Sequence, residues 1–336
     1  MPDEGQQEVE QLLLPPGPMP DFPPHPVGGR TVRLHGGTMG TDWSLEAVAP
    51  PEMTDGMLRT ALDHVFDRVI AQMSQWDEES DLSRFNHAAP GSRHRLRNEF
   101  ALVLDCALNI ARATSGAFDP TIGGASELWG FGHTAGPCER PSSEEAVGTR
   151  KLDWRAVAVS EGGRILLQPG GLKLDFSGIA KGFAVDAGVI ALKKLRVDHV
   201  LLNIGGELRA SGLRQDGLPW WVDLETPPAS LAQSARIGLL GWSVATSGNY
   251  RRRRAASGQS WGHTIEPESG LPLADDILSV TVLHPGCMQA DALATAIMVL
   301  GPETGAVFAN ANAIPARMVT KSEVWESKAW TRWLSP

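Results

Sequence analysis

The sequence is poor in cysteine, has no long apolar run and carries no excess of basic residues. Its three cysteines, Cys106, Cys138 and Cys287, are widely spaced and form no CxxC pair. Neither a disulfide framework nor a zinc site is therefore indicated, and we expect reduced thiols. No apolar run is long enough to suggest a membrane span. The formal charge of -9 argues against a nucleic-acid-binding protein, which would need a basic face.

Several common catalytic signatures are absent as well. The chain contains no HExxH or GxGxxG motif and no GxxxxGK[ST] loop. The residues thus give no signal for a zinc protease of the HExxH type, a Rossmann dinucleotide site or a Walker-type nucleotide site.

The first 29 residues differ in composition from the rest. They contain eight prolines and no lysine or arginine, a composition that disfavours regular packed elements. We expect residues 1–29 to be a flexible Pro-rich extension and residues 30–336 to form the domain. A secretory signal would begin with basic residues and an apolar core. Neither is seen, which predicts a cytoplasmic protein.

The domain has an ordinary globular composition, with 42% hydrophobic and 21% charged residues. Apolar residues recur at helical spacing in three stretches, residues 54–76, 98–116 and 177–195. Strand-like runs often follow one another directly, with the helices in separate blocks. This order favours an α+β fold with mainly antiparallel sheets and packed helices.

An apolar stretch, "PGCMQADALATAIMVLG", contains Asp291 and, four residues later, Thr295. Positions i and i+4 lie on the same face of a helix. Helix capping is one explanation, because both residue types satisfy free N–H groups in a first turn. A hard cation bound by oxygen ligands is the other.

A second stretch, "LKLDFSGIAKGFAVD", places Asp175 after a strand and Lys181 in the first turn of a helix. A helix N-terminus with a lysine beside it can bind phosphate. A capped helix with an exposed lysine is the alternative. Together with the glycine-rich "GGTMGT", the long loop "TSGAFDPTIGGASELWGFG" and His263, the residues point to a phosphorylated ligand and a hard cation.

Six motifs recur in order over about residues 31–320: "GTMGT", "MSQWDEESDLSRFN", "GAFDPTIG…LWGFG", "LDFSGIAKGFAVD", "NIGGE" with "ATSGNYR", and "CMQADALATA". In this respect the chain resembles the FAD:protein FMN transferase, or ApbE-like, family. The resemblance implies a T-fold-like architecture with FAD bound between two lobes. It also implies Mg²⁺-dependent transfer of the FMN half of FAD to a Thr or Ser hydroxyl of a target flavoprotein, with release of AMP.

The resemblance also implies the residues that carry this function. FAD contacts are expected from Met39, Trp76, Ala117, Phe118, Asp119, Asp175, Lys181, His263 and Ile265. The Mg²⁺ ligands are expected to be the side chains of Asp291 and Thr295 and the carbonyls of Gly178 and Ala294. Lys181, His263 and Asp291 form the expected catalytic set. His263 is our hypothesis for the general base, because an ordinary histidine pKa suits proton transfer near neutral pH.

The sequence departs from the family pattern at two places. Glu266 stands where the family's H-x-I-D-P segment has aspartate, and "GGASEL" replaces the more usual Pro-Leu-Val run before "WGFG". Many relatives carry an export signal or lipid anchor, which we do not see here, so a cytoplasmic target flavoprotein is expected. Two rival functions remain: an FAD pyrophosphatase that yields FMN and AMP, and a non-catalytic FAD-binding protein.

Overall fold

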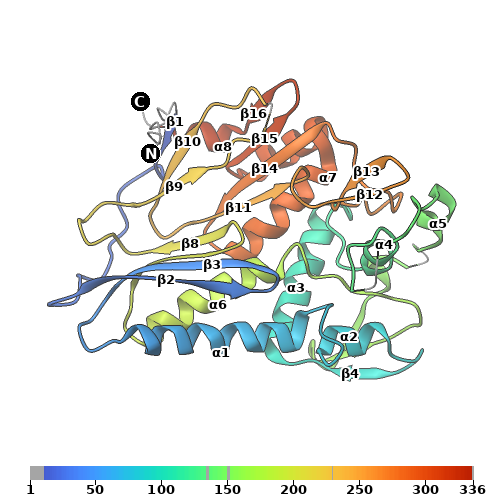
Figure 1. Cartoon of the computed structure of the whole chain (residues 1–336), viewed down its shortest axis with the longest axis horizontal. Helices are drawn as coiled ribbons and strands as arrows, with labels where there is room; N and C mark the ends of the chain where they lie inside the picture. The colour runs from blue at the N-terminus through green and yellow to red at the C-terminus, as the bar shows by residue number, and fades with distance from the viewer. Residues whose placement is uncertain (1–10, 134–135, 150–151, 229, 335–336) are drawn as a thin grey trace.

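The computed structural model describes residues 11–133, 136–149, 152–228 and 230–334. An antiparallel eight-stranded sheet runs through its centre (Figure 1). In spatial order it consists of β16 (Val324–Glu326), β15 (Ala316–Thr320), β14 (Ile277–His284), β11 (Ser243–Gly248), β8 (Glu207–Ser211), β7 (His199–Ile204), β3 (Thr41–Ala49) and β2 (Arg30–Thr38). The α+β expectation is confirmed.

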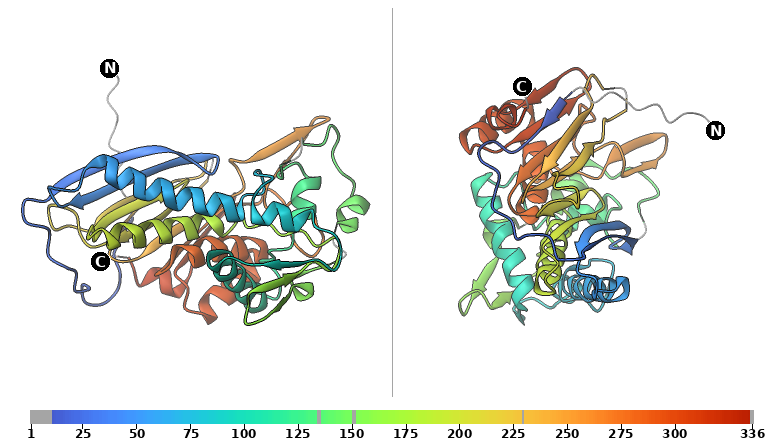
Figure 2. Two further views of the ribbon diagram at one scale, coloured as in Figure 1. Left: turned by 90° about the horizontal axis from the view of Figure 1, so that it is seen from below. Right: turned by 90° about the vertical axis from the view of Figure 1, so that its left-hand side faces the viewer.

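The sheet has two halves, joined where β8 pairs with β11. Only Ser243↔Arg209 and Val244↔Leu208 form this connection. The four long helices are α1 (Asp55–Met73), α3 (Asn98–Ala113), α6 (Ala180–Lys194) and α7 (Cys287–Ala311). α3 packs against α7 and α1. α1 and α6 lie side by side on the half that contains β2, β3, β7 and β8 (Figure 2). α7 packs on β11 and β14.

The remaining elements are short. They are β1 (Gln11–Leu13), α2 (Asp81–Asn86), β4 (Arg93–Arg95), α4 (Gly123–Leu128), α5 (Ser143–Gly148), η1 (Trp154–Ala156), β5 (Ala158–Ser160), β6 (Ile165–Leu167), β9 (Trp220–Leu224), β10 (Ala235–Leu239), β12 (Arg253–Ala256), β13 (Gln259–Gly262) and α8 (Lys328–Thr331). β1, β10 and β9 form one small sheet, β4, β6 and β5 another, and β12 and β13 a hairpin.

Local sequence explains the long helices. Thr54 caps α1 by accepting a hydrogen bond from the Met57 N–H at 3.2 Å, as its position before the apolar repeat predicts. α3 ends at Ala113, and Gly116 follows with φ +93°, a left-handed conformation that glycine adopts without steric cost. The three predicted helices are therefore confirmed, with ends within a few residues of those expected.

Residues 11–29 differ from the expected flexible extension. β1 pairs in parallel with β10, and Leu13 is fully buried against Trp330 and Trp333. The apolar "QLLL" segment supplies the buried leucine. The proline-containing residues after it form no helix or strand. The expectation of no regular packed element is thus wrong for residues 11–13, which form β1; residues 1–10 lie outside the described part of the chain.

α7 is the one described helix that is long and apolar enough, by length and composition, to cross a membrane. Its backbone is interrupted at Gly301, where φ is 78°, and Pro302 follows. Proline cannot continue the hydrogen-bond pattern of the preceding turn, which explains the break. Ala290, Ile297 and Met298 are fully buried, and α7 packs on β11 and β14, so the helix also fits the core of this fold.

Candidate active site

The N-terminal turns of α6 and α7 meet at a close helix crossing. A Cβ added to Gly182 would lie 2.4 Å from the Cys287 carbonyl oxygen, so the crossing requires glycine. The Gly182 N–H donates to Oδ2 of Asp291 at 3.0 Å. Capping was one of the two explanations that the sequence allowed for Asp291. Asp291 does cap a helix, but that helix is α6 and not α7, to which Asp291 belongs.

Lys181 lies beside this crossing, where it forms an ion pair with Glu207 at the start of β8. Glu207 and Asp291 are 3% and 4% exposed, whereas the Lys181 side chain is 25% exposed. The ammonium therefore pairs with a carboxylate that is itself almost fully buried. Burial opposes the charge on Lys181, but Glu207 and Asp291 outweigh it and hold the pKa of Lys181 above its usual value. Sequence reasoning missed Glu207, although it lies in the quoted "NIGGE" motif.

Both carboxyl groups resist ionisation in this setting. Burial, reinforced by Asp291 and opposed by Lys181, raises the pKa of Glu207 to about 7. Burial likewise raises the pKa of Asp291, against the opposing effects of Lys181 and the Gly182 N–H. A cation bound beside them would favour the charged form of both groups.

Thr295 places a hydroxyl next to Gly178, one of the expected metal ligands. Its Oγ1 lies 3.0 Å from Oγ of Ser247 on β11, and a Cβ built on Gly178 would be 3.2 Å from it. The structure thus brings Gly178, Asp291 and Thr295 to one helix junction. Ala294 is in the same turns of α7, with its methyl group fully buried in the core between α7 and the sheet.

No group of three or more His, Cys, Asp or Glu residues able to hold a metal ion occurs among the described residues. A magnesium site needs only one or two carboxylates alongside phosphate and water oxygens. Oxygen donors from Asp291, Thr295 and the Gly178 backbone fit that requirement. Oδ2 of Asp291 accepts the Gly182 N–H, and its other oxygen, Oδ1, can face a cation.

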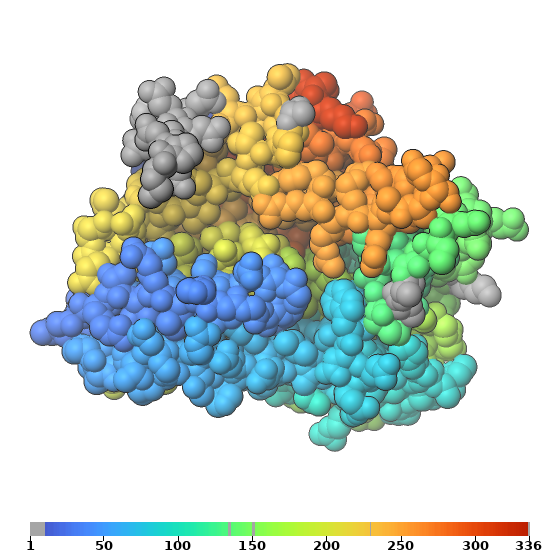
Figure 3. Space-filling view, in the orientation of Figure 1, coloured from blue at the N-terminus to red at the C-terminus, as the bar shows by residue number. Residues whose placement is uncertain are grey.

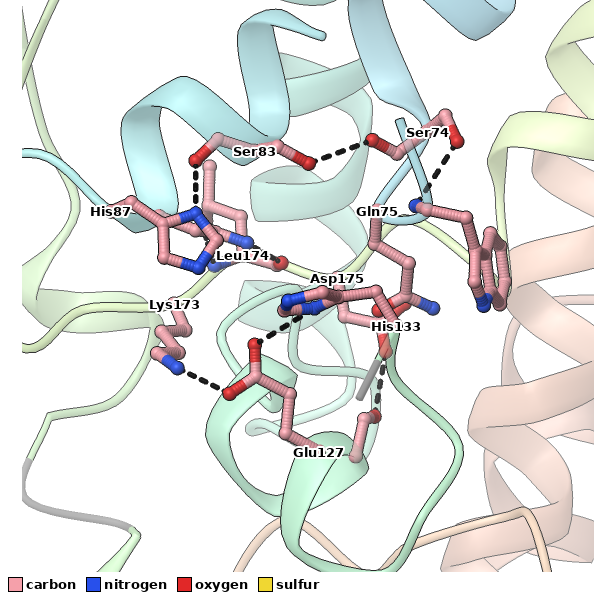
Figure 4. Close-up of polar contacts among 12 residues, drawn as sticks. Ser74, Gln75, Ser83, His87, Glu127, His133, Lys173, Leu174 and Asp175 are labelled. Atoms are coloured by element: carbon pink, nitrogen blue, oxygen red, sulfur yellow. Dashed lines mark hydrogen bonds and ion pairs between the residues drawn. The ribbon is translucent and has the colours of Figure 1, made fainter. Parts of the chain in front are cut away.

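Asp175 is oriented by two hydrogen bonds from its surroundings. Ser126 Oγ donates to Oδ2 at 2.6 Å, and the Ser177 N–H donates to Oδ1 at 2.7 Å. Ser126 belongs to "GGASEL", the segment that departs from the family pattern. This segment therefore supplies a hydrogen-bond donor to Asp175, a predicted FAD-binding residue. Figure 4 shows Asp175 between Gln75 and Glu127; Gln75 Nε2 in turn donates to Ser177 Oγ at 3.0 Å.

The predicted nucleotide loop contributes in two different ways. The Phe118 ring lies 3.3 Å from a Cβ built on Gly178, which places it beside the helix junction. Oδ1 of Asp119 accepts hydrogen bonds from the backbone and side chain of Thr121, at 2.8 and 2.6 Å. The carboxylate of Asp119 therefore shapes its own loop, while Ala117 is half-buried two residues earlier.

Met39 and Trp76 form an outer edge of the site. Met39 and Gly40 are the two turn residues of the β2–β3 hairpin, with φ of 50° and 72°, values typical of a type I′ turn. An open hollow of about 620 Å³ borders this turn. Trp76 is 51% exposed after α1. Figure 3 shows the hairpin tip (blue) and the segment after α1 (light blue) facing the β12–β13 region (orange).

His263 follows β13 and is half-buried, with its ring 6.1 Å from Phe131. Its Nδ1 lies 3.3 Å from the Arg252 carbonyl oxygen, so the neutral ring carries its proton on Nδ1 and leaves Nε2 to accept. Burial, together with Arg252, lowers the pKa of His263 to about 4, not the ordinary value assumed from sequence.

Ile265 is 2% exposed and packs near Trp129, so only its backbone could face a ligand.

Comparison with known proteins gives a consistent family assignment. The model of the ApbE family matches residues 39–318. A Vibrio cholerae protein named FAD:protein FMN transferase is 35% identical over 294 residues, covering 87% of this chain and 88% of that protein. The Escherichia coli K12 protein of the same name is 29% identical over 308 residues, covering 90% and 87%.

Solved structures agree with the sequence comparisons. The flavin transferase ApbE from Vibrio cholerae has a TM-score of 0.83 and 33% identity, covering 91% of this chain and 100% of that chain. The apo form of Pseudomonas stutzeri flavinyl transferase ApbE has a TM-score of 0.84 and 30% identity, covering 92% and 98%.

Proposed function

Because the chain belongs to the ApbE family, we propose that it transfers the FMN half of FAD to a threonine or serine hydroxyl of a target flavoprotein. Relatives named FAD:protein FMN transferase align with most of its length. The observation that carries the proposal is the meeting of Lys181, Asp291 and Thr295 at one buried helix crossing. Phosphoryl transfer depends on this kind of positioned charge.

The reaction exchanges the phosphoanhydride bond of FAD for a phosphoester bond to the acceptor. The acceptor oxygen forms a bond to the phosphorus of the FMN half, and the bond from that phosphorus to the bridging pyrophosphate oxygen breaks. The electron pair of the broken bond leaves with AMP, and the acceptor hydroxyl loses its proton to a base. No oxidant or reductant is needed.

Lys181 supplies positive charge at the pyrophosphate. It lies in the first turn of α6, where the helix dipole also favours an anion. Its pKa is held above the usual value, so the ammonium stays charged through the physiological range. Glu207 holds this side chain in place through the ion pair.

Magnesium fits the oxygen atoms at the same junction. Asp291, Thr295 and the carbonyls of Gly178 and Ala294 would hold it, which suits a hard cation that keeps only one or two protein carboxylates. When bound, it would neutralise negative charge on the pyrophosphate. Burial raises the pKa values of Glu207 and Asp291, and a cation bound beside them would favour the charged form of both carboxyl groups.

His263 is the proposed general base. Its lowered pKa of about 4 leaves the ring neutral at physiological pH, so Nε2 can accept the acceptor hydroxyl's proton. The same low pKa makes it a weaker base than an ordinary histidine, which places more of the catalysis on positioning and charge. Asp175 and Lys181 both act electrostatically on His263, in keeping with a place near the phosphate site.

Mass spectrometry of a co-expressed candidate flavoprotein tests the function. The expected result is an FMN group on a Thr or Ser of the acceptor, lost when that residue is changed to Ala. Release of AMP and free FMN with no modified acceptor would instead identify an FAD pyrophosphatase. FAD binding without AMP release, for every acceptor tried, would leave a non-catalytic FAD-binding protein.

A further inference from the structure

Asp186, in the second turn of α6, belongs to none of the roles described above. Its Oδ1 and Oδ2 accept hydrogen bonds from the N–H groups of Cys287 and Met288, at 3.0 and 2.9 Å. These are the first two residues of α7, whose own N-cap, Gly286, has no side chain to offer. Asp186 therefore caps α7 from the neighbouring helix.

The two helices exchange caps. Asp291 on α7 accepts the Gly182 N–H of α6, and the N-cap residue of α6, Ile179, makes no side-chain cap. Each helix thus lacks a cap of its own and receives a carboxylate from the other. The exchange fixes the distance and the angle between the two N-terminal turns, where Gly182 already brings the backbones into contact.

Strand β8 holds the same arrangement from a third side. Glu207 pairs with Lys181 and Arg209 pairs with Asp186. Glu207 and Arg209 are two residues apart, so their side chains point to the same face of β8. The rise along the helix axis from position 181 to position 186 is roughly 7 Å, about the same as the rise along the strand from position 207 to position 209. The two ion pairs have opposite polarity. A shift of α6 that brought Lys181 towards Arg209 would therefore place like charges together.

We propose that Asp186 is a positioning residue that sets α7, with Asp291 and Thr295, against α6 and the Gly178 turn that precedes it. The proposal rests on the proposed function, because it concerns how the ligand set of that site is assembled. The hydrogen-bond and ion-pair partners of Asp186 are Cys287, Met288 and Arg209, none of which is an expected FAD or metal ligand. It acts by holding the two helices that carry them.

Asp186→Asn tests the proposal. Asparagine keeps the shape, but its NH₂ group cannot accept the second N–H and it loses the ion pair with Arg209. Groups that position metal ligands typically contribute about 10- to 100-fold in affinity. The dissociation constant for Mn²⁺ should therefore rise at least about tenfold. Mn²⁺ binding is measured by electron paramagnetic resonance with FAD present and no acceptor protein. Transfer at saturating Mg²⁺ should recover most of the wild-type rate.

Thr54→Ala is the matched control, because it also removes a helix cap, that of α1, away from the α6–α7 junction. It should lower the melting temperature without changing Mn²⁺ affinity. Unchanged Mn²⁺ affinity in a folded Asp186→Asn would overturn the proposal and leave the proposed function intact. If Asp186→Asn does not fold, Arg209→Gln decides: weaker Mn²⁺ binding supports the proposal, and wild-type binding overturns it. A wild-type protein that neither binds Mn²⁺ nor transfers FMN would contradict the proposed function itself.

Discussion

Asp291 shows why single residues were hard to assign from sequence. The spacing of Asp291 and Thr295 indicated a shared helix face but left capping and metal binding open. The structure supports a capping role, because Asp291 accepts the Gly182 N–H, and also places Thr295 beside Gly178. One carboxylate can do both, since it has two oxygens. Glu207 could not be assigned, because its partner Lys181 is distant in sequence and meets it only through packing of α6 on β8.

Glu207→Gln should weaken both the fold and the site. Loss of one partner from a buried ion pair typically costs about 3–5 kcal/mol, and we expect a cost near the lower value because Asp291 still faces Lys181. Lys181 should then pair more closely with Asp291 and compete with the metal, so the Mg²⁺ concentration for half-maximal transfer should rise. Urea unfolding and a Mg²⁺ titration measure the two effects.

Glu46→Gln is the control for this variant, because Glu46 forms an exposed pair with Arg33 at 3.6 Å. Exposed pairs contribute about 0–1 kcal/mol. Equal, small effects of both substitutions would show that the Lys181–Glu207 pair does not support the site.

His263 should titrate far below an ordinary histidine. Its pKa is about 4 when folded, against 6.5 for an unperturbed group. Between these values the unfolded chain binds the proton more readily, so the contribution of His263 to stability is present above pH 6.5 and is lost as the pH falls towards 4. NMR titration of the His263 ring, with His263→Gln to assign the signal, measures this. A ring pKa near 6.5 would contradict the buried, Arg252-facing arrangement.

The long helices were predicted from local pattern, and the one strand that was not expected has a physical reason. Local apolar spacing predicts α1, α3 and α6. Thr54 marks the start of α1, and Gly116 follows the end of α3. β1 could not be expected, because its only support is distant: β10 and the tryptophans near the C-terminus. A proline-rich composition indicated flexibility, yet β1 and the buried Leu13 attach this segment to the domain at one end, and His25 stacks on His199 further along.

Leu13→Ala should destabilise the protein, although the residue lies outside every motif. Truncation of a fully buried leucine costs about 2–5 kcal/mol, and Leu13 is fully buried. The dissociation constant for FAD should not change in the folded variant, because Leu13 packs among tryptophans away from the site residues. Leu12→Ala is the control, since Leu12 is 40% exposed. If the two variants had the same stability, the packing of β1 would not matter to the fold.

Across the entire structure, the sequence indicated the fold class but not the way in which the sheet is assembled. Alternating apolar residues predict strands, and their direct succession predicts antiparallel pairing. The joining of the two halves by β8 and β11 depends on contacts between distant segments, which no local pattern encodes. This joining sets α6 and α7 against each other, so the geometry of the candidate site was beyond prediction even where its residues were named.

The central claim is that the α6–α7 junction binds a divalent cation and performs FMN transfer. Asp291→Asn tests it most directly, because the asparagine carbonyl can still accept the Gly182 N–H while the charge that holds a hard cation is removed. The measurement is the amount of AMP released and of FMN bound to a purified acceptor, across a range of Mg²⁺ concentrations. We predict that the wild type releases one AMP per FMN attached. Asp291→Asn should fold, with a melting temperature close to that of the wild type. It should neither release AMP nor attach FMN to the acceptor. A variant with the wild-type rate and the wild-type dependence on Mg²⁺ would contradict the account and leave Asp291 as a helix cap alone.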